Sequence, residues 1–238
     1  MAINRFDSFF GKPKNWNGVN IYSPTMLEIS DIGEEKFYIY LIFASFNKEK
    51  ILHGLFGFNN EDYMRYESEN DYDVLVSHPT ILQHICDSLS FFVKKNVEFD
   101  FHGNSFCIDN VMFFNKDNYI EVIKIIQELN GSTTKEENAL KPSNNKAKQM
   151  LEKMLAMSKK QENKEDYLDL KDIVSILCSA PDNGINIFNV GNLTVYQVYE
   201  QFERVNIKET HNRILPVWAN GNLDKDGKLP EWITKTKL

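Results

Sequence analysis

The sequence predicts an α+β fold in which a mixed first part is followed by a linker and an all-helical last part. Apolar residues recur at helical spacing in several windows, whereas residues 97–101 alternate between apolar and acidic side chains, as a half-buried strand does. A polar stretch without periodicity separates the two parts. We therefore expect an α+β domain over residues 1–130, a linker over 131–143, and a helical subdomain with an irregular tail over 144–238.

The first helix is expected to begin at Ser23-Pro24, where a capping residue precedes a proline at the first helical position. The next segment, residues 34–46, is apolar on every face, so periodicity does not separate a buried helix from a central strand. We favour a helix, because two acidic residues open the segment and thirteen residues exceed a usual strand. The choice for residues 37–46 stays open.

Residues 61–73 contain six acidic side chains and one arginine, which indicates a loop or an exposed edge. A helix should begin at His78-Pro79 and continue to about Lys95, with apolar residues along one side.

The alternating strand at 97–101 is followed by a turn at 102–104 and a return strand at 106–108, which together predict a hairpin. The last helix of this part should cover residues 119–129, where apolar residues again share one face.

The second part is expected to contain three helices, at 144–163, 169–179 and 193–206. The third has the clearest pattern. Thr194 and Gln197 stand at capping-box spacing, and the residues after them form one apolar stripe. The members of this stripe are Val195, Val198, Tyr199, Phe202 and Val205. Such a stripe packs against another surface and carries no catalytic groups.

Composition excludes several classes of function. The chain has 238 residues, 42% of them hydrophobic and 26% charged, which are ordinary values for a globular protein with its own core. Apolar runs are too short to span a bilayer, and the first residues do not form a signal peptide. Residues 1–130 carry 19 acidic against 11 basic side chains, which disfavours a nucleic-acid surface. Cys86, Cys107 and Cys178 are expected to be reduced thiols.

Candidate chemistry is sparse. Residues 222–230 begin like an EF-hand loop, but Ile233 stands where the bidentate glutamate is needed, so we expect no metal. A nucleophile pair of Cys107 and His102 is geometrically allowed, yet a buried thiol beside a turn histidine is favoured. We expect no cofactor and no enzymatic activity. The alternative from another class is a small hydrolase or nuclease that uses the acidic residues of 61–73.

Protein binding is therefore the favoured function. The expected helix 144–163 carries a methionine-containing face, and methionine-rich faces adapt to apolar partners. Two tryptophans lie in proline-broken segments of the tail, and tryptophan is enriched at interface hot spots. The candidate partner-binding residues are Met150, Met154, Met157, Tyr199, Phe202, Trp218 and Trp232. For the helical stripes themselves, packing on each other is the favoured interpretation, since three helices need a core of their own, and both roles can hold.

The order of these features resembles a group of structural or assembly proteins of tailed bacteriophages. The resemblance rests on SPTMLEISDIGEEKFYIYL, NKDNYIEVIKIIQELNG, NNKAKQMLEKMLAMSKK and LTVYQVYEQFERV, read in that order. Within the group the chain is most similar to a tail-assembly chaperone, which implies binding of the tape-measure protein in the host cytoplasm. A tail or baseplate component of the virion is the runner-up. The sequence leaves the oligomeric state open, including a homo-oligomer.

Overall fold

The computed structural model describes residues 4–131, 168–221 and 228–236. Over these residues the fold is α+β, as the sequence predicts, with two small antiparallel sheets. The first elements are α1 (Arg5–Phe9), β1 (Lys14–Trp16), β2 (Val19–Ile21), α2 (Met26–Ile32), α3 (Glu34–Ala44), η1 (Lys50–Leu55), α4 (Asn60–Met64), α5 (Asp71–Ser77) and α6 (Pro79–Val93). The others are β3 (Glu98–Asp100), β4 (Ser105–Ile108), β5 (Val111–Asn115), α7 (Tyr119–Leu129), α9 (Leu170–Ser179), η2 (Val190–Asn192) and α10 (Val195–Ala219).

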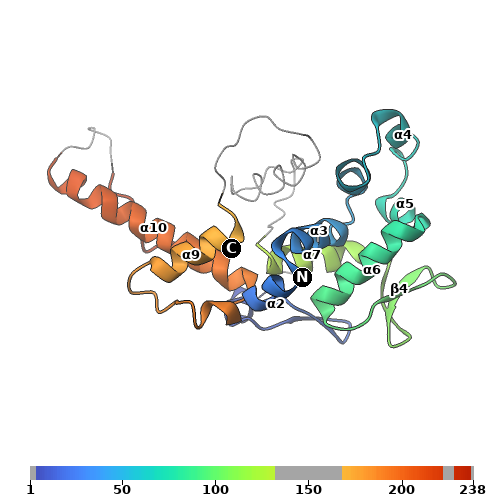
Figure 1. Cartoon of the computed structure of the whole chain (residues 1–238), viewed down its shortest axis with the longest axis horizontal. Helices are drawn as coiled ribbons and strands as arrows, with labels where there is room; N and C mark the ends of the chain where they lie inside the picture. Colours follow the sequence, from blue (N-terminus) through green and yellow to red (C-terminus); the bar gives the residue numbers. More distant parts are fainter. Residues whose placement is uncertain (1–3, 132–167, 222–227, 237–238) are drawn as a thin grey trace.

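The molecule is elongated, and its two ends are built from different parts of the chain. Figure 1 shows α9 and α10 at the left, α3, α6 and α7 toward the centre and right, and α4 at the upper right. A large cluster of buried apolar residues joins α3, α5, α6, α7 and the three-stranded sheet. Leu170 of α9 and Val195 of α10 belong to this cluster as well. The second part of the chain therefore packs onto the core of the first, and whether the two unfold separately stays a prediction.

The helix prediction for residues 34–46 is confirmed, because α3 is helical from Glu34 to Ala44. The chain then turns at Phe46, a buried residue with a positive φ of 48°. Its ring packs with those of four other aromatic residues from α5, the sheet and α7. These residues are Tyr72, Phe106, Phe114 and Tyr119. Helices α6 and α7 also occupy the expected positions.

The predicted helix start at Ser23-Pro24 is wrong by two residues. Thr25 is the N-cap of α2, and it forms a capping box with Glu28. Ser23 has a different partner, because its hydroxyl oxygen accepts the backbone N–H of Tyr196 at 3.2 Å. The carbonyl of Pro24 likewise accepts the N–H of Val195 at 2.9 Å.

The sequence suggested a loop or an exposed edge over residues 61–73, but this acidic segment is not a continuous loop. It contains α4 and the start of α5, whose N-caps are Asn59 and Asn70. Acidic residues in the first turn of each helix interact favourably with the helix dipole, which explains their position. Asparagine caps and acidic first turns were the signals for two short helices.

The predicted hairpin is present as β3 and β4, and a third strand, β5, extends it to a sheet. Asp109 and Asn110 form the tight connection between β4 and β5, both with positive φ. The third strand was missed because its inner residues, Phe113 and Phe114, are both buried, so the strand does not alternate simply.

Helix α10 is much longer than expected. It has 25 residues and continues to Ala219, through Pro216 and Trp218, where an irregular tail was predicted. Pro216 cannot donate an N–H to the carbonyl of Asn212, four residues earlier, but Asn212 is exposed, so water can bind that carbonyl instead. The predicted end near residue 206 was wrong because the apolar stripe stops at Val205, whereas the helix continues over residues that are not buried.

Candidate functional site

The predicted interaction stripe on α10 faces mainly into the protein. Phe202 is only 5% exposed and packs in a small cluster with Ile173, Leu177 and Val198. Tyr199 is partly buried, and its hydroxyl is hydrogen-bonded to that of Tyr38 on α3. Burial raises the pKa of Tyr199 to about 12. The first half of the stripe thus forms the packing of α10 on α9 and α3.

The second half of α10 is different. From Asn206 to Gly221 none of the residues is buried. Three apolar side chains close to its end are exposed, including Trp218 at 50%. They are Leu215, Val217 and Trp218, and we call them the α10 tip. Figure 1 shows that this end of α10 extends beyond α9 and away from the rest of the protein.

The C-terminal segment 228–236 returns along α10 and is fixed to it by hydrogen bonds. His211 Nδ1 lies 2.6 Å from the carbonyl oxygen of Pro230, and Arg204 donates to the carbonyl of Thr234 at 2.8 Å. The hydroxyl of Thr236 donates to Glu200 Oε1 at 2.9 Å. Trp232, also a predicted partner-binding residue, is 45% exposed in this segment.

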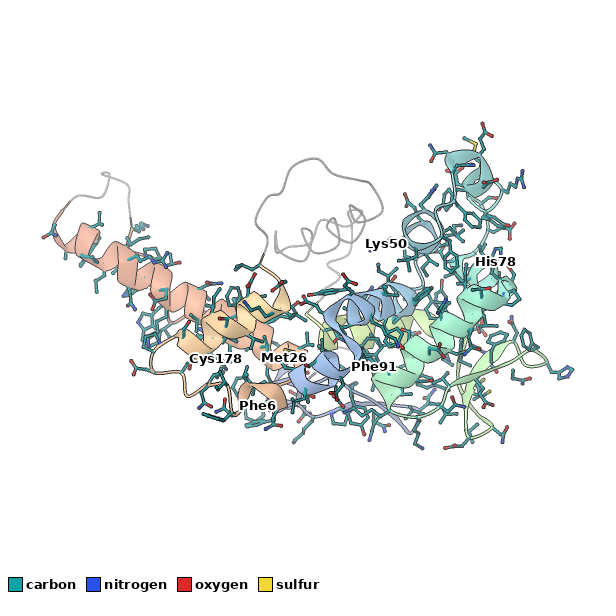
Figure 2. All side chains as sticks on the ribbon, in the orientation of Figure 1. Phe6, Met26, Lys50, His78, Phe91 and Cys178 are labelled. Atoms are coloured by element: carbon teal, nitrogen blue, oxygen red, sulfur yellow. The ribbon has the colours of Figure 1, made fainter. Side chains whose placement is uncertain are left out.

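The N-terminal helix α1 lies on the start of α10 and forms a hollow with it. The hollow has a volume of about 280 Å³ and is lined by Arg5, Phe6, Phe9, Tyr196 and Glu200. The backbone carbonyl of Phe9 accepts a hydrogen bond from Gln197 Nε2 at 2.9 Å, which fixes α1 to α10. Phe6, labelled in Figure 2, is 68% exposed.

Sequence reasoning missed this hollow. The signal that could have shown it is the aromatic spacing Phe6, Phe9 and Phe10, which places several rings on one short helix. Their T-shaped contacts, with ring centroids 5.0 Å and 5.5 Å apart, are present in the structure.

The structure describes only some of the remaining predicted residues. Met150, Met154 and Met157 lie outside the described residues, and so does most of the EF-hand-like loop. Among the described residues, no three His, Cys, Asp or Glu side chains are grouped so that they could hold a metal ion. No helix in the described part of the chain is long and apolar enough to cross a membrane.

Two of the acidic residues that the alternative hydrolase or nuclease would use form ion pairs with lysines. Asp71 lies 3.5 Å from Lys48 Nζ, and Asp73 pairs with Lys116.

Burial raises the pKa of Cys86 to about 12, which keeps this thiol protonated and poorly nucleophilic. Cys107 Sγ lies 3.7 Å from the hydroxyl of Ser105.

Comparison with known proteins finds a similarity in the part of the chain that contains α9, α10 and the C-terminal segment. Residues 159–237 match the family model for the second domain of YomV. This is a Bacillus phage-derived protein family. No curated protein and no solved structure matches the chain. The similarity supports a phage-associated protein, and the match leaves out α1 to α7.

Proposed function

We propose that this chain is a non-enzymatic bacteriophage assembly protein that works by binding another protein through the α10 tip. One observation carries the proposal. Leu215 and Trp218, three residues apart and therefore on one face of α10, are both exposed near the end of this projecting helix. This helix lies within the residues that match a phage-derived domain family. Exposed apolar side chains grouped at one place are a recurrent feature of interaction sites, and tryptophan is a frequent hot-spot residue.

The most specific form of the proposal is a tail-assembly chaperone that engages the tape-measure protein in the host cytoplasm. The order of sequence features supports it, together with the apolar helix end, which suits the apolar face of another helix. A tail or baseplate component of the virion is the alternative within the same class. Both forms need a protein partner and neither needs a cofactor.

The alternative of another class, a hydrolase or nuclease, is less well supported. A nuclease of the metal-dependent kind needs carboxylates that are free to bind metal ions. Asp71 and Asp73 instead pair with Lys48 and Lys116. We therefore propose no nucleic-acid partner.

Binding to the tape-measure protein of the same phage tests the proposal. The purified chain should bind it, and Trp218→Ala should weaken the binding by about 2 kcal/mol or more, as at an interface hot spot. Asn212→Ala, at an exposed polar position of the same helix, is the matched control and should bind like the wild type. Equal binding by Trp218→Ala and Asn212→Ala would contradict the assignment of the α10 tip.

A further inference from the structure

Residues 228–236, which we call the C-terminal strap, lie on α10 and are recognised there through their backbone. His211 donates to the carbonyl of Pro230 at 2.6 Å, and Arg204 donates to that of Thr234 at 2.8 Å. Carbonyl groups are the same in every residue, so these two contacts hold an extended segment without reading its side chains.

The last described residue of the strap is its most firmly held part. Thr236 is the only buried residue of the strap. Arg5 of α1 donates to the Thr236 hydroxyl oxygen at 2.8 Å, and this hydroxyl donates to Glu200 Oε1 at 2.9 Å. The apolar side chains of Trp232 and Ile233 are 45% and 76% exposed. Hydrogen bonds at a few positions therefore hold the strap, and most of its apolar surface is not packed.

The α10 tip continues the face of α10 on which the strap lies. Glu200, Arg204, His211, Leu215 and Trp218 follow one another at spacings of three, four or seven residues, which places them on one side of the helix. The first three bind the strap, whereas Leu215 and Trp218 are 40% and 50% exposed. The face is thus covered over its first part and exposed at its end.

The connection between the tip and the strap is short. Residues 222–227 join Gly221 to Lys228, and a chain of this length spans at most roughly 25 Å. None of the strap contacts described above involves these connecting residues. The same contacts can therefore be made to α10 of another copy, but only if the tips of the two copies lie close together.

We propose that two copies of this chain exchange their C-terminal straps, so that the strap of each copy lies on α10 of the other. The short connections then hold the two α10 tips side by side, and Leu215 and Trp218 of each copy cover the same residues of its partner. Such a contact is symmetric and closes as a dimer. The inference goes beyond the proposed function, because it assigns the tip a second occupant and needs no other phage protein.

Effective concentration sets the affinity expected of this dimer. Within one copy, the short connection keeps the strap at an effective concentration on the order of 1 mM. Exchange replaces strap contacts by identical ones, so by itself it gives a dissociation constant of about 1 mM. Covering Trp218 as a hot-spot residue contributes a factor of about thirty, which lowers the expected dissociation constant to about 30 μM.

Sedimentation velocity of the full chain over a wide concentration range tests the affinity. The wild type should change from monomer to dimer at tens of micromolar. Trp218→Ala should weaken dimerisation about thirtyfold, because the tip contact is lost and the strap contacts remain. Asn212→Ala, at an exposed polar position of the same helix, is the matched control and should dimerise like the wild type.

Isotope-mixed cross-linking tests the exchange itself. Light and heavy-isotope-labelled chains are mixed in equal amounts, held at high concentration, and treated with a lysine-reactive cross-linker. Lys235 of the strap and Lys208 of α10 are both exposed, and Lys208 lies between Arg204 and His211. Random pairing makes half of the dimers mixed, and in these every Lys208–Lys235 cross-link should join a light to a heavy peptide. In the monomer fraction both peptides should carry the same label.

Three outcomes would overturn the inference. They are a wild type that stays monomeric at high concentration, a dimer whose Lys208–Lys235 cross-links all join peptides of the same label, and dimerisation that Trp218→Ala leaves unchanged. Binding of the tape-measure protein is measured separately on the monomer at low concentration. Trp218-dependent binding without strap exchange overturns this inference alone, whereas strap exchange without tape-measure binding supports it and contradicts the proposed function.

Discussion

Thr25 and Thr194 cap two helices from opposite parts of the chain and pair with each other as an isolated antiparallel bridge. Each accepts the backbone N–H of the residue three positions later, and each has a capping box. The Met26 N–H donates to the carbonyl of Leu193 at 2.9 Å. The starts of α2 and α10 are therefore held in one hydrogen-bonded unit.

Met26→Pro tests the contribution of this bridge. Met26 is the first helical residue of α2, where proline is well tolerated, and Thr25 already has the extended backbone that a following proline requires. The substitution therefore removes the hydrogen bond to Leu193 without breaking the helix. We expect a loss of about 1 kcal/mol in the free energy of unfolding relative to Met26→Ala, measured in urea.

Met26→Ala is the necessary control, because the Met26 side chain packs against both apolar clusters and its removal has a cost of its own. Equal stability of the proline and alanine variants would mean that the bridge contributes nothing.

Lys48 holds together the connection between α4 and α5. Its side chain is buried, and Nζ donates to the carbonyls of Tyr66 at 2.7 Å and Glu67 at 2.9 Å, and also to that of Glu69. Lys48→Met leaves these carbonyls without their donor. We expect it to lower the free energy of unfolding by about 3 kcal/mol, measured by chemical denaturation.

Lys50→Met is the matched control for this prediction. Burial lowers the pKa of Lys50 to about 8, so the fold disfavours the charged form of this side chain. Its replacement at pH 7 should leave stability unchanged or increase it. A similar loss in both variants would contradict the specific role of Lys48.

The sequence predicted α10 well where the local pattern determines the structure. The spacing of Thr194 and Gln197 indicated the capping box, and the stripe that follows indicated a packing face. Residues 34–46 could be assigned to a helix from their length and acidic start, although periodicity did not decide it.

Features that depend on distant residues could not be predicted. Ser23 looked like a helix cap, but its hydroxyl accepts the N–H of Tyr196, which lies 173 positions away. The hollow combines Phe6 of α1 with Glu200 of α10, and no local pattern connects two such segments. Trp218 was predicted to be exposed, but in an irregular tail, because the apolar stripe of α10 stops at Val205 and gives no local signal that the helix continues to Ala219.

Glu28 should contribute to acid sensitivity. Burial by itself raises the pKa of this carboxyl, but hydrogen bonds from Lys94 and the Thr25 backbone outweigh burial, and the net pKa lies below the ordinary value of 4.5. Since the folded pKa is lower than the unfolded one, the stabilising effect is present above pH 4.5 and is lost as the pH falls through the folded pKa.

Glu28→Gln should therefore reduce the fall in melting temperature that the wild type shows as the pH drops below about 4.5. Glu35→Gln changes an exposed carboxylate on α3 and provides the comparison. Identical pH profiles for wild type and Glu28→Gln would show that this carboxylate does not contribute.

Phe202 and Trp218 lie on the same helix, and their substitutions should have opposite consequences. Phe202 is buried against Ile173 and Leu177, so Phe202→Ala removes a large core side chain and should cost about 3–5 kcal/mol in the free energy of unfolding. Trp218 is half exposed, and Trp218→Ala should change stability by no more than about 0.5 kcal/mol while it weakens partner binding. Calorimetry of both variants measures the difference.

Because Val195 and Leu170 belong to the large cluster, we expect Phe202→Ala to shift a single unfolding transition. A separate transition for the C-terminal part would instead support two independently folding domains. A stable Phe202→Ala that no longer binds its partner would show that the first half of the stripe, and not the tip, is the docking surface.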